Sequence, residues 1–243
     1  MEITRLAEGL REHTAGLADA AATADPNTPV PTCPKWTLRV LVGHVGQAQR
    51  WARSIIESGP SAVPDPFDAD PGEPSTWSDW LRDSADGLAE TVLAAGDRPV
   101  WTFFGEQPAR YWLRRMLHDT AVHHADAALT AGAPVTVAPD LAADGIDELL
   151  ELLSHPLTPT LRPDLAVLKG TGQTLRLAAD ASWLITRTPD GVRWSRSDGP
   201  ADVTVRGPAG DLLLVLTRRQ SVDRVTVEGD QALLDHWLAH LTL

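Results

Sequence analysis

The chain has 243 residues, of which 43% are hydrophobic and 22% are charged. This length allows one or two folded domains with a substantial core, and the composition is not that of a disordered chain. The formal net charge of −12 argues against a broad phosphate-binding surface, so we expect no nucleic-acid partner. The single cysteine, Cys33, excludes an intramolecular disulfide and suits a reducing compartment.

The N-terminal segment carries acidic and basic residues scattered among apolar ones. A secretory signal peptide has a basic segment followed by an apolar one, and that order is missing here. No apolar run approaches the roughly 18 residues that a membrane-spanning helix needs. We therefore expect a cytoplasmic protein that acts without a membrane, as a monomer or a small homo-oligomer.

The first half of the chain predicts helices separated by proline-rich loops, and four long helices joined in this way predict an up-and-down bundle. Thr37 and Ser75 are residues that favour helix N-caps. The segment 96–107 is expected to be an irregular connection. The helices are expected over residues 3–23, 37–57, 75–95 and 108–131, with loops over 25–34 and 60–74.

After about residue 138 the pattern changes to alternating strands, and Pro189-Asp190-Gly191 is a turn sequence. We expect an α+β protein overall: a helical bundle over residues 1–137, a connecting helix over 138–157 and a small α+β domain over 158–243. The strands are expected over 174–178, 183–188, 192–195, 201–206 and 224–228, and the helices over 140–154, 207–216 and 229–241.

One histidine lies in the middle of an apolar helical face. Leu41, His44, Ala48, Trp51 and Ile55 are spaced at 3, 4, 3 and 4 residues, which places them on one side of the second helix. Taken alone, His44 fits a hydrogen-bonded core histidine better than a ligand.

The fourth helix offers two further ligand types on its own apolar face. Asp119 and His123 are four residues apart, so their side chains lie on the same side. A carboxylate there is costly unless it is paired or bound to a cation. An Arg115–Asp119 salt bridge is the structural alternative. Two imidazoles and one carboxylate would otherwise suit Zn²⁺, Fe²⁺, Mn²⁺ or Ni²⁺ and leave positions open for water or substrate. The neighbouring His118 and His124 compete with His123 for the inward position.

Several sequence blocks resemble the mycothiol-dependent maleylpyruvate isomerase family, whose N-terminal part is a DinB-like metal-binding bundle. The family has an opening of the type CPGWT…LVxHL and a second block of the type RRMxHExAVHRxDA. Its C-terminal domain is similar to sterol-carrier-type folds. The blocks that carry the resemblance are CPKWT at 33–37, LVGH at 41–44, RRMLHDTAVHHADA at 114–127, GPAGDLLL at 207–214 and VEGDQALL at 227–234.

The resemblance implies that His44, Asp119 and His123 hold a divalent metal, with zinc preferred. The chain departs from the family pattern at one ligand, because the family has Glu where this chain has Asp119, which is one methylene shorter. The resemblance also implies a low-molecular-weight thiol as cosubstrate, mycothiol or another. The implied chemistry is addition of thiolate to an electron-poor double bond, rotation about the new single bond and loss of the thiolate. If the thiolate stays, the reaction is an S-transfer.

Three other residues are candidates for substrate binding. Arg219 follows an apolar helix and corresponds roughly to a basic residue of the family, although a solvated helix end, where Arg complements the helix dipole, explains it better. Trp51 and Trp112 each lie on a metal-bearing face and are candidates for a pocket wall, although core packing is the favoured role. Beyond the metal ligands, no catalytic residue is predicted.

The sequence therefore predicts a metal- and thiol-dependent isomerase or S-transferase acting on a small electrophilic molecule, for example an acidic one such as maleylpyruvate. A second hypothesis is a metal enzyme of the same fold recruited to a biosynthetic lyase or conjugation step without free mycothiol, which Asp119 favours. A third is a non-catalytic module that binds a metal or a ligand. His44 and His123 count against a site that has lost its metal.

Overall fold

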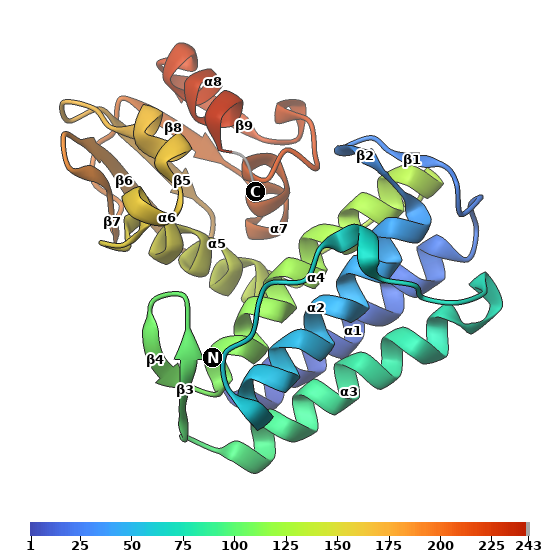
Figure 1. The fold of residues 1–243 in the computed structure, drawn as a ribbon. Helices are drawn as coiled ribbons and strands as arrows, with labels where there is room; N and C mark the ends of the chain where they lie inside the picture. Colours follow the sequence, from blue (N-terminus) through green and yellow to red (C-terminus); the bar gives the residue numbers. More distant parts are fainter. Residues whose placement is uncertain (242–243) are drawn as a thin grey trace. The chain divides into compact units, whose positions relative to one another are not determined.

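The computed structural model describes residues 1–241, and the chain divides into two compact units, Met1–Val135 and Thr136–Leu243. The last two residues of the expected C-terminal domain, 242–243, lie outside the described residues. The first unit is helical with two short hairpins, and the second contains a five-stranded sheet with helices (Figure 1). The predicted α+β class, with a helical bundle followed by a sheet domain, is confirmed.

The elements of the first unit alternate long helices with short hairpins. They are α1 (Ile3–Ala21), β1 (Pro29–Val30), β2 (Cys33–Thr37), α2 (Leu38–Ser58), the 3₁₀ turns η1 (Pro66–Asp68) and η2 (Pro74–Thr76), α3 (Trp77–Ala95), β3 (Pro99–Thr102), β4 (Gly105–Pro108) and α4 (Arg110–Ala131).

The second unit begins with helices and continues with the sheet. Its elements are α5 (Pro139–Ser154), α6 (Thr158–Leu161), η3 (Pro163–Leu168), β5 (Thr174–Ala178), β6 (Ser182–Thr188), β7 (Gly191–Arg196), β8 (Val203–Arg206), α7 (Ala209–Leu216), η4 (Val222–Arg224), β9 (Thr226–Gly229) and α8 (Gln231–His240).

The helix ends of the bundle follow the capping signals of the sequence. The side chain of Thr37 accepts a hydrogen bond from the backbone N–H of Val40 at 3.4 Å and caps α2 as predicted. Gly132 ends α4 in the left-handed conformation, with φ of 67°. The first of these caps fixes where α2 begins and the second fixes where α4 ends.

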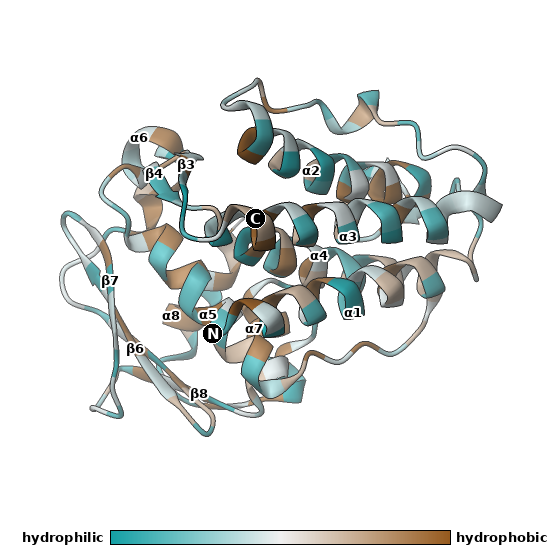
Figure 2. Cartoon of the chain, turned by 90° about the horizontal axis from the view of Figure 1, so that it is seen from below, coloured by the Kyte–Doolittle hydropathy of each residue, from teal (hydrophilic) through white to brown (hydrophobic). Residues whose placement is uncertain are grey.

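Aliphatic side chains from all four helices meet in the bundle core. Leu17 of α1, Leu41 of α2, Leu81 of α3 and Ala127 of α4 have no exposed surface. Each buried leucine contributes on the order of 2 kcal/mol through removal of apolar surface from water. Figure 2 shows the resulting alternation of hydrophilic and hydrophobic bands along α1. The core holds α2 and α4 side by side, and the candidate site lies between these two helices.

The bundle is not a simple up-and-down one, because α2 and α3 run parallel. Gly46 faces Trp80, and Arg50 donates to Ser84 one turn further along both helices, at 2.8 Å. A Cβ at Gly46 would lie 2.1 Å from the Trp80 ring, so only glycine lets this ring pack against α2. The physical reason for the parallel pair is the long connection over 59–76, which returns along the bundle before α3 begins (Figure 1).

Three local expectations are wrong in the first unit. Ser75 does not cap α3, because it lies inside the 3₁₀ turn η2, where the N–H of Thr76 bonds to the carbonyl of Glu73. The segment expected to be irregular forms the antiparallel hairpin β3–β4, which turns at Gly105 with φ of 93°. The loop expected over 25–34 contains β1 and the start of β2, which also pair antiparallel.

The sheet of the second unit has the order β7-β6-β5-β8-β9. β5 and β8 are parallel, and the other neighbours are antiparallel. Helix α5, expected as a connection, is part of this unit: Asp147 accepts a hydrogen bond from the indole of Trp183 at 2.8 Å and pairs with Arg196 at 2.6 Å. Within residues 1–241, no helix combines the length and apolarity needed to cross a bilayer.

Candidate metal centre

The first candidate ligand is on α2. His44 lies two turns into this helix, between the buried residues Leu41 and Val45. Its side chain remains 24% exposed, so the imidazole is at the border of the core. The ring of Trp36, on the preceding strand β2, lies 4.8 Å from the imidazole ring, measured between centroids. The helix and the strand before it therefore hold His44 from two sides.

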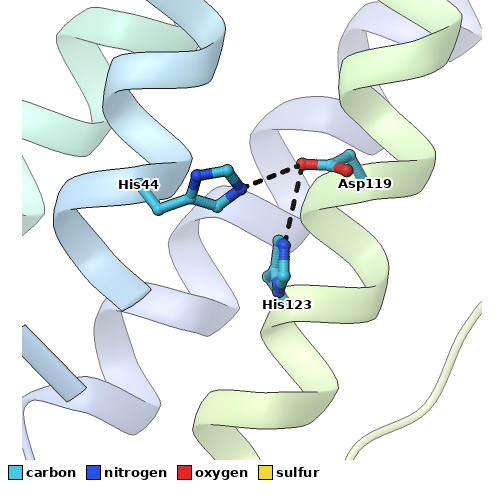
Figure 3. Close-up of side chains that lie close together, drawn as sticks. All are labelled: His44, Asp119 and His123. Carbon is cyan, nitrogen blue, oxygen red and sulfur yellow. Dashed lines mark ion pairs between the residues drawn. The ribbon is translucent and has the colours of Figure 1, made fainter. Parts of the chain in front are cut away.

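The second and third candidate ligands are one turn apart on α4. Nε2 of His44 lies 4.0 Å from Oδ2 of Asp119, and Nε2 of His123 lies 3.9 Å from the same oxygen. One potential ligand atom from each residue lies within 4.8 Å of those of the other two (Figure 3). Ligand atoms around a single zinc ion at about 2.1 Å are roughly 3–3.5 Å apart. The three side chains thus need only a small inward movement to share one ion.

A buried carboxyl group orients one of the imidazoles. Nδ1 of His123 lies 2.8 Å from Oδ2 of Asp126, which has no exposed surface. The hydroxyl of Thr32, in the turn between β1 and β2, donates to the other oxygen of Asp126. With Nδ1–H donating to Asp126, Nε2 of His123 presents its lone pair to His44 and Asp119. Histidine ligands of metal sites are commonly held in this way.

Asp126 and Thr32 are functional candidates that the sequence analysis missed. Asp126 is three residues after His123, which places it close to the same helical face. That spacing was a usable signal, because a metal-bound histidine usually needs an acceptor for its second nitrogen. Thr32 had no such signal, since it comes from a loop far away in the sequence.

The two interpretations of Asp119 occur together. Nη2 of Arg115 lies 3.3 Å from Oδ1 of Asp119, so the salt bridge exists. It uses one carboxylate oxygen, while the other faces the two imidazoles. Burial raises the pKa of Asp119, but His123, Arg115 and His44 together lower it by more. The net effect is a pKa below the usual value. The carboxylate is therefore ionised near neutral pH and ready to bind a cation.

His44 is in the protonation state that metal binding requires. Burial lowers its pKa, the neighbouring His123 lowers it further, and Asp119 only partly opposes them, which leaves the pKa at about 4. The imidazole is therefore neutral at pH 7 and its lone pair is available. A set of two imidazoles and one carboxylate with these charges fits a divalent cation.

The remaining histidines of α4 face away from this trio. Nδ1 of His124 lies 3.1 Å from Nδ1 of His13 on α1, and His118 lies close enough to His13 to lower the pKa of that imidazole. Among the described residues, the single group of three or more side chains that could share a metal ion is His44, Asp119 and His123. The structure therefore brings together the three residues that helical spacing selected, with His123 rather than His118 or His124 completing the group.

A cavity of about 190 Å³ opens beside the candidate ligands. Its wall includes His44, Asp119 and Arg115 and the aromatic rings of Trp51 and Trp112. Both tryptophans thus contribute to the wall of a cavity, the less favoured of the two roles that the sequence offered for them. Trp112 is also fully buried, so it serves the core as well.

Arg219 belongs to the second unit. Its guanidinium is buried, and Nη1 donates to the backbone carbonyl of Thr217 at 2.6 Å, just after α7. Arg218 before it adopts a φ of 61°, which reverses the chain at the helix end. The guanidinium is therefore not the solvated side chain that was weighed as the alternative. Its role toward a substrate remains a prediction.

Fold and site together define a class: a helical bundle with a His, Asp and His group, joined to a small sheet domain. Two family models match the chain in the same order. The mycothiol maleylpyruvate isomerase N-terminal domain matches residues 7–128, and the MDMPI C-terminal domain matches residues 140–236. The chain belongs to the mycothiol-dependent maleylpyruvate isomerase family.

Solved structures support the same fold. The chain is similar to the crystal structure of a mycothiol-dependent maleylpyruvate isomerase, with a TM-score of 0.58 and 15% identity over 94% of this chain and 93% of that one. A histidine-to-alanine variant of such an enzyme gives a TM-score of 0.56, with the same identity and coverage. No functionally curated protein matches the sequence closely enough to count as a relative.

The role of Asp126 gives a first prediction. Asp126→Asn keeps the size of the side chain but removes the charge that favours the Nδ1–H form of His123, so the affinity for Zn²⁺ should fall about 10- to 100-fold. The affinity is measured by competition with a chromophoric chelator. Asp86→Asn, which changes an exposed carboxylate of α3, is the control and should bind as the wild type does. Equal affinities in the two variants would contradict the role given to Asp126.

The buried histidines predict a pH dependence of stability. Burial, then His124, His118 and Arg5, lowers the pKa of His13 to about 4, and His44 has a similar value. Between pH 6.5 and 4 the unfolded chain takes up protons that the folded chain does not, so stability is lost as pH falls. We expect the metal-free protein to lose up to about 3 kcal/mol per histidine across this window.

Urea unfolding in EDTA at several pH values between 7 and 4 measures this loss. The free energy of unfolding should fall steadily below pH 6.5, and His13→Gln should give a shallower slope because one buried imidazole has been removed. A free energy of unfolding that is flat over this window, or a slope unchanged by His13→Gln, would show that these histidines are not held neutral by the fold.

Proposed function

We propose that the protein is a divalent-metal-dependent enzyme that uses mycothiol or another low-molecular-weight thiol to isomerise a small electrophile or to transfer the thiol to it. The observation that carries the proposal is the group of His44, Asp119 and His123, whose ligand atoms lie within 4.8 Å of one another. Membership in the mycothiol-dependent maleylpyruvate isomerase family supports the thiol and the reaction type. We propose zinc as the metal and the cytoplasm as the compartment.

The residues present fit a divalent ion. His44 supplies a neutral imidazole nitrogen, His123 supplies a second imidazole nitrogen and Asp119 supplies one carboxylate oxygen. Three protein donors leave at least one coordination position for an outside ligand, as in catalytic rather than structural zinc sites. A bound divalent ion would supply the positive charge that lowers the pKa of a thiol and keeps it as thiolate near neutral pH.

The surrounding residues shape what reaches this position. The Trp36 ring covers both imidazoles, with its centroid 4.8 Å from that of His44 and 5.8 Å from that of His123. The cavity beside His44 and Asp119 gives an electrophile room next to the open position. Arg115 holds Asp119 and places one positive charge beside the reacting groups.

A second candidate function rests on Asp119 itself. It is shorter than the family's Glu, and one of its oxygens is already bound to Arg115. This arrangement favours a same-fold metal enzyme recruited to a biosynthetic lyase or conjugation step without free mycothiol. A non-catalytic metal- or ligand-binding module is a weaker alternative, because the cavity next to the ligand group gives a substrate a place to bind.

Thermal unfolding with and without mycothiol separates these functions. In the zinc-loaded protein, mycothiol at a hundredfold excess over its Kd should raise the Tm by roughly 5 °C. S-methylated mycothiol, which cannot form a thiolate, should raise it much less. Asp119→Ala should abolish the response, whereas Asp119→Glu, which restores the family's ligand, should retain it.

Each other outcome contradicts part of the proposal. Zinc binding with no response to mycothiol would favour the recruited enzyme. An equal response in metal-free protein would remove the metal from thiol binding. Equal shifts with mycothiol and its S-methyl derivative would show that the sulfur does not bind at the metal.

A further inference from the structure

The cavity beside the candidate ligands has a polar end and an apolar end. His44, Asp119 and Arg115 form the polar end. The rings of Trp51, Phe103 and Trp112 form the apolar end, together with Met116, Val63 and Pro64. A ligand that fills the cavity must therefore present an apolar body to the rings while its reacting group lies at the ligand end.

The indole N–H groups of this wall are already used. Nε1 of Trp51 donates to the hydroxyl of Ser61 at 3.0 Å, and Nε1 of Trp112 donates to the backbone carbonyl of Trp101 at 2.9 Å. Neither Ser61 nor Trp101 lines the cavity. The half-buried Trp51 therefore offers its ring rather than a hydrogen-bond donor, with the fully buried Trp112 behind it, and such a surface favours flat apolar ligands.

The three rings support one another. Trp51 and Phe103 are stacked with centroids 5.9 Å apart, and both meet the Trp112 ring edge to face, at 5.0 Å and 5.7 Å. Trp112 is fixed in the core, whereas Phe103 lies 37% exposed at the turn of the β3–β4 hairpin. Phe103 is thus the ring of the three that can adjust to an entering ligand.

The charge of the wall argues against a small dicarboxylate. Arg115 is the one cationic residue among the described residues that line the cavity, and it is bound to Asp119. With a divalent ion bound, both positive charges lie at the polar end, so the second carboxylate of an extended dicarboxylate would lose its hydration at the apolar end without a cationic partner. The volume of about 190 Å³ exceeds the roughly 150 Å³ of a protein cavity that accommodates benzene, so one aromatic ring with a short side chain fits.

We infer that the electrophile is a neutral, aryl-substituted molecule with its reacting carbon on a short chain, and that Phe103 determines this specificity. The inference rests on the proposed function, because it places the reacting carbon beside the metal ligands. It departs from dicarboxylate substrates of the maleylpyruvate type. Phe103 acts here as a specificity residue and takes no part in the bond-making steps.

Binding of unreactive probes tests the inference without turnover. 4-Phenyl-2-butanone carries an aryl group on a short ketone chain, and succinate is a saturated dicarboxylate of similar length. Titration of the zinc-loaded protein, followed by quenching of tryptophan fluorescence and by calorimetry, should show 1:1 binding of the ketone and at least tenfold weaker binding of succinate. Phe103→Ala should weaken ketone binding about tenfold.

Phe104→Ala is the matched control, because Phe104 is the neighbouring turn residue and does not line the cavity. It should bind the ketone as the wild type does, and circular dichroism checks that both variants are folded. Preferential binding of succinate, or equal losses in the two variants, would overturn the inference. Repeating the titration in EDTA separates the two proposals: ketone binding that persists without zinc supports the aryl cavity even if the metal and thiol experiments fail.

Discussion

The arrangement of the site depends on a carboxyl group that has no contact with solvent. Asp126 is fully buried in α4, and the hydrogen bonds from Thr32 and His123 satisfy its two oxygens. Because a buried carboxyl without partners costs several kcal/mol, the turn between β1 and β2 and the ring of His123 are held in place together. The consequence is that Nε2 of His123 points at the same space as His44 and Asp119.

The topology of the bundle explains how the site acquires its two walls. The parallel course of α2 and α3 follows from the long connection over 59–76, and α2 and α4 remain neighbours. Helices α2 and α4 each follow a short hairpin. The β1–β2 hairpin supplies Trp36 and Thr32 next to the imidazoles, and the β3–β4 hairpin supplies Phe103 at the mouth of the cavity. One hairpin therefore organises the ligands, and the other shapes the space for the electrophile.

The helices and the three candidate ligands could be predicted because helical spacing is written directly in the sequence. The apolar positions around His44 and around Asp119 and His123 give the facing sides of α2 and α4, and Thr37 gives the start of α2. The hairpins could not be predicted in the same way. Their strands are two to five residues long and contain prolines, so they show too little alternation to be distinguished from loops.

One feature of the site and one of the bundle could not be predicted from helical spacing. Helical spacing presented the Arg115 salt bridge and the metal as alternatives, whereas the geometry lets Asp119 use one oxygen for each. The parallel pair of helices depends on the path of a loop, which no periodicity encodes. Both outcomes required tertiary structure, because they concern groups whose neighbours come from distant parts of the chain.

We propose that His44, Asp119 and His123 together hold one divalent ion. The most direct measurement is the metal content of dialysed, zinc-loaded protein by mass spectrometry, for the wild type, His44→Ala, His123→Ala and the neighbouring control His118→Ala. We expect about one ion per chain in the wild type and in His118→Ala, and almost none in the other two variants. Retention of zinc in His44→Ala and His123→Ala, or its absence from the wild type, would contradict the proposal.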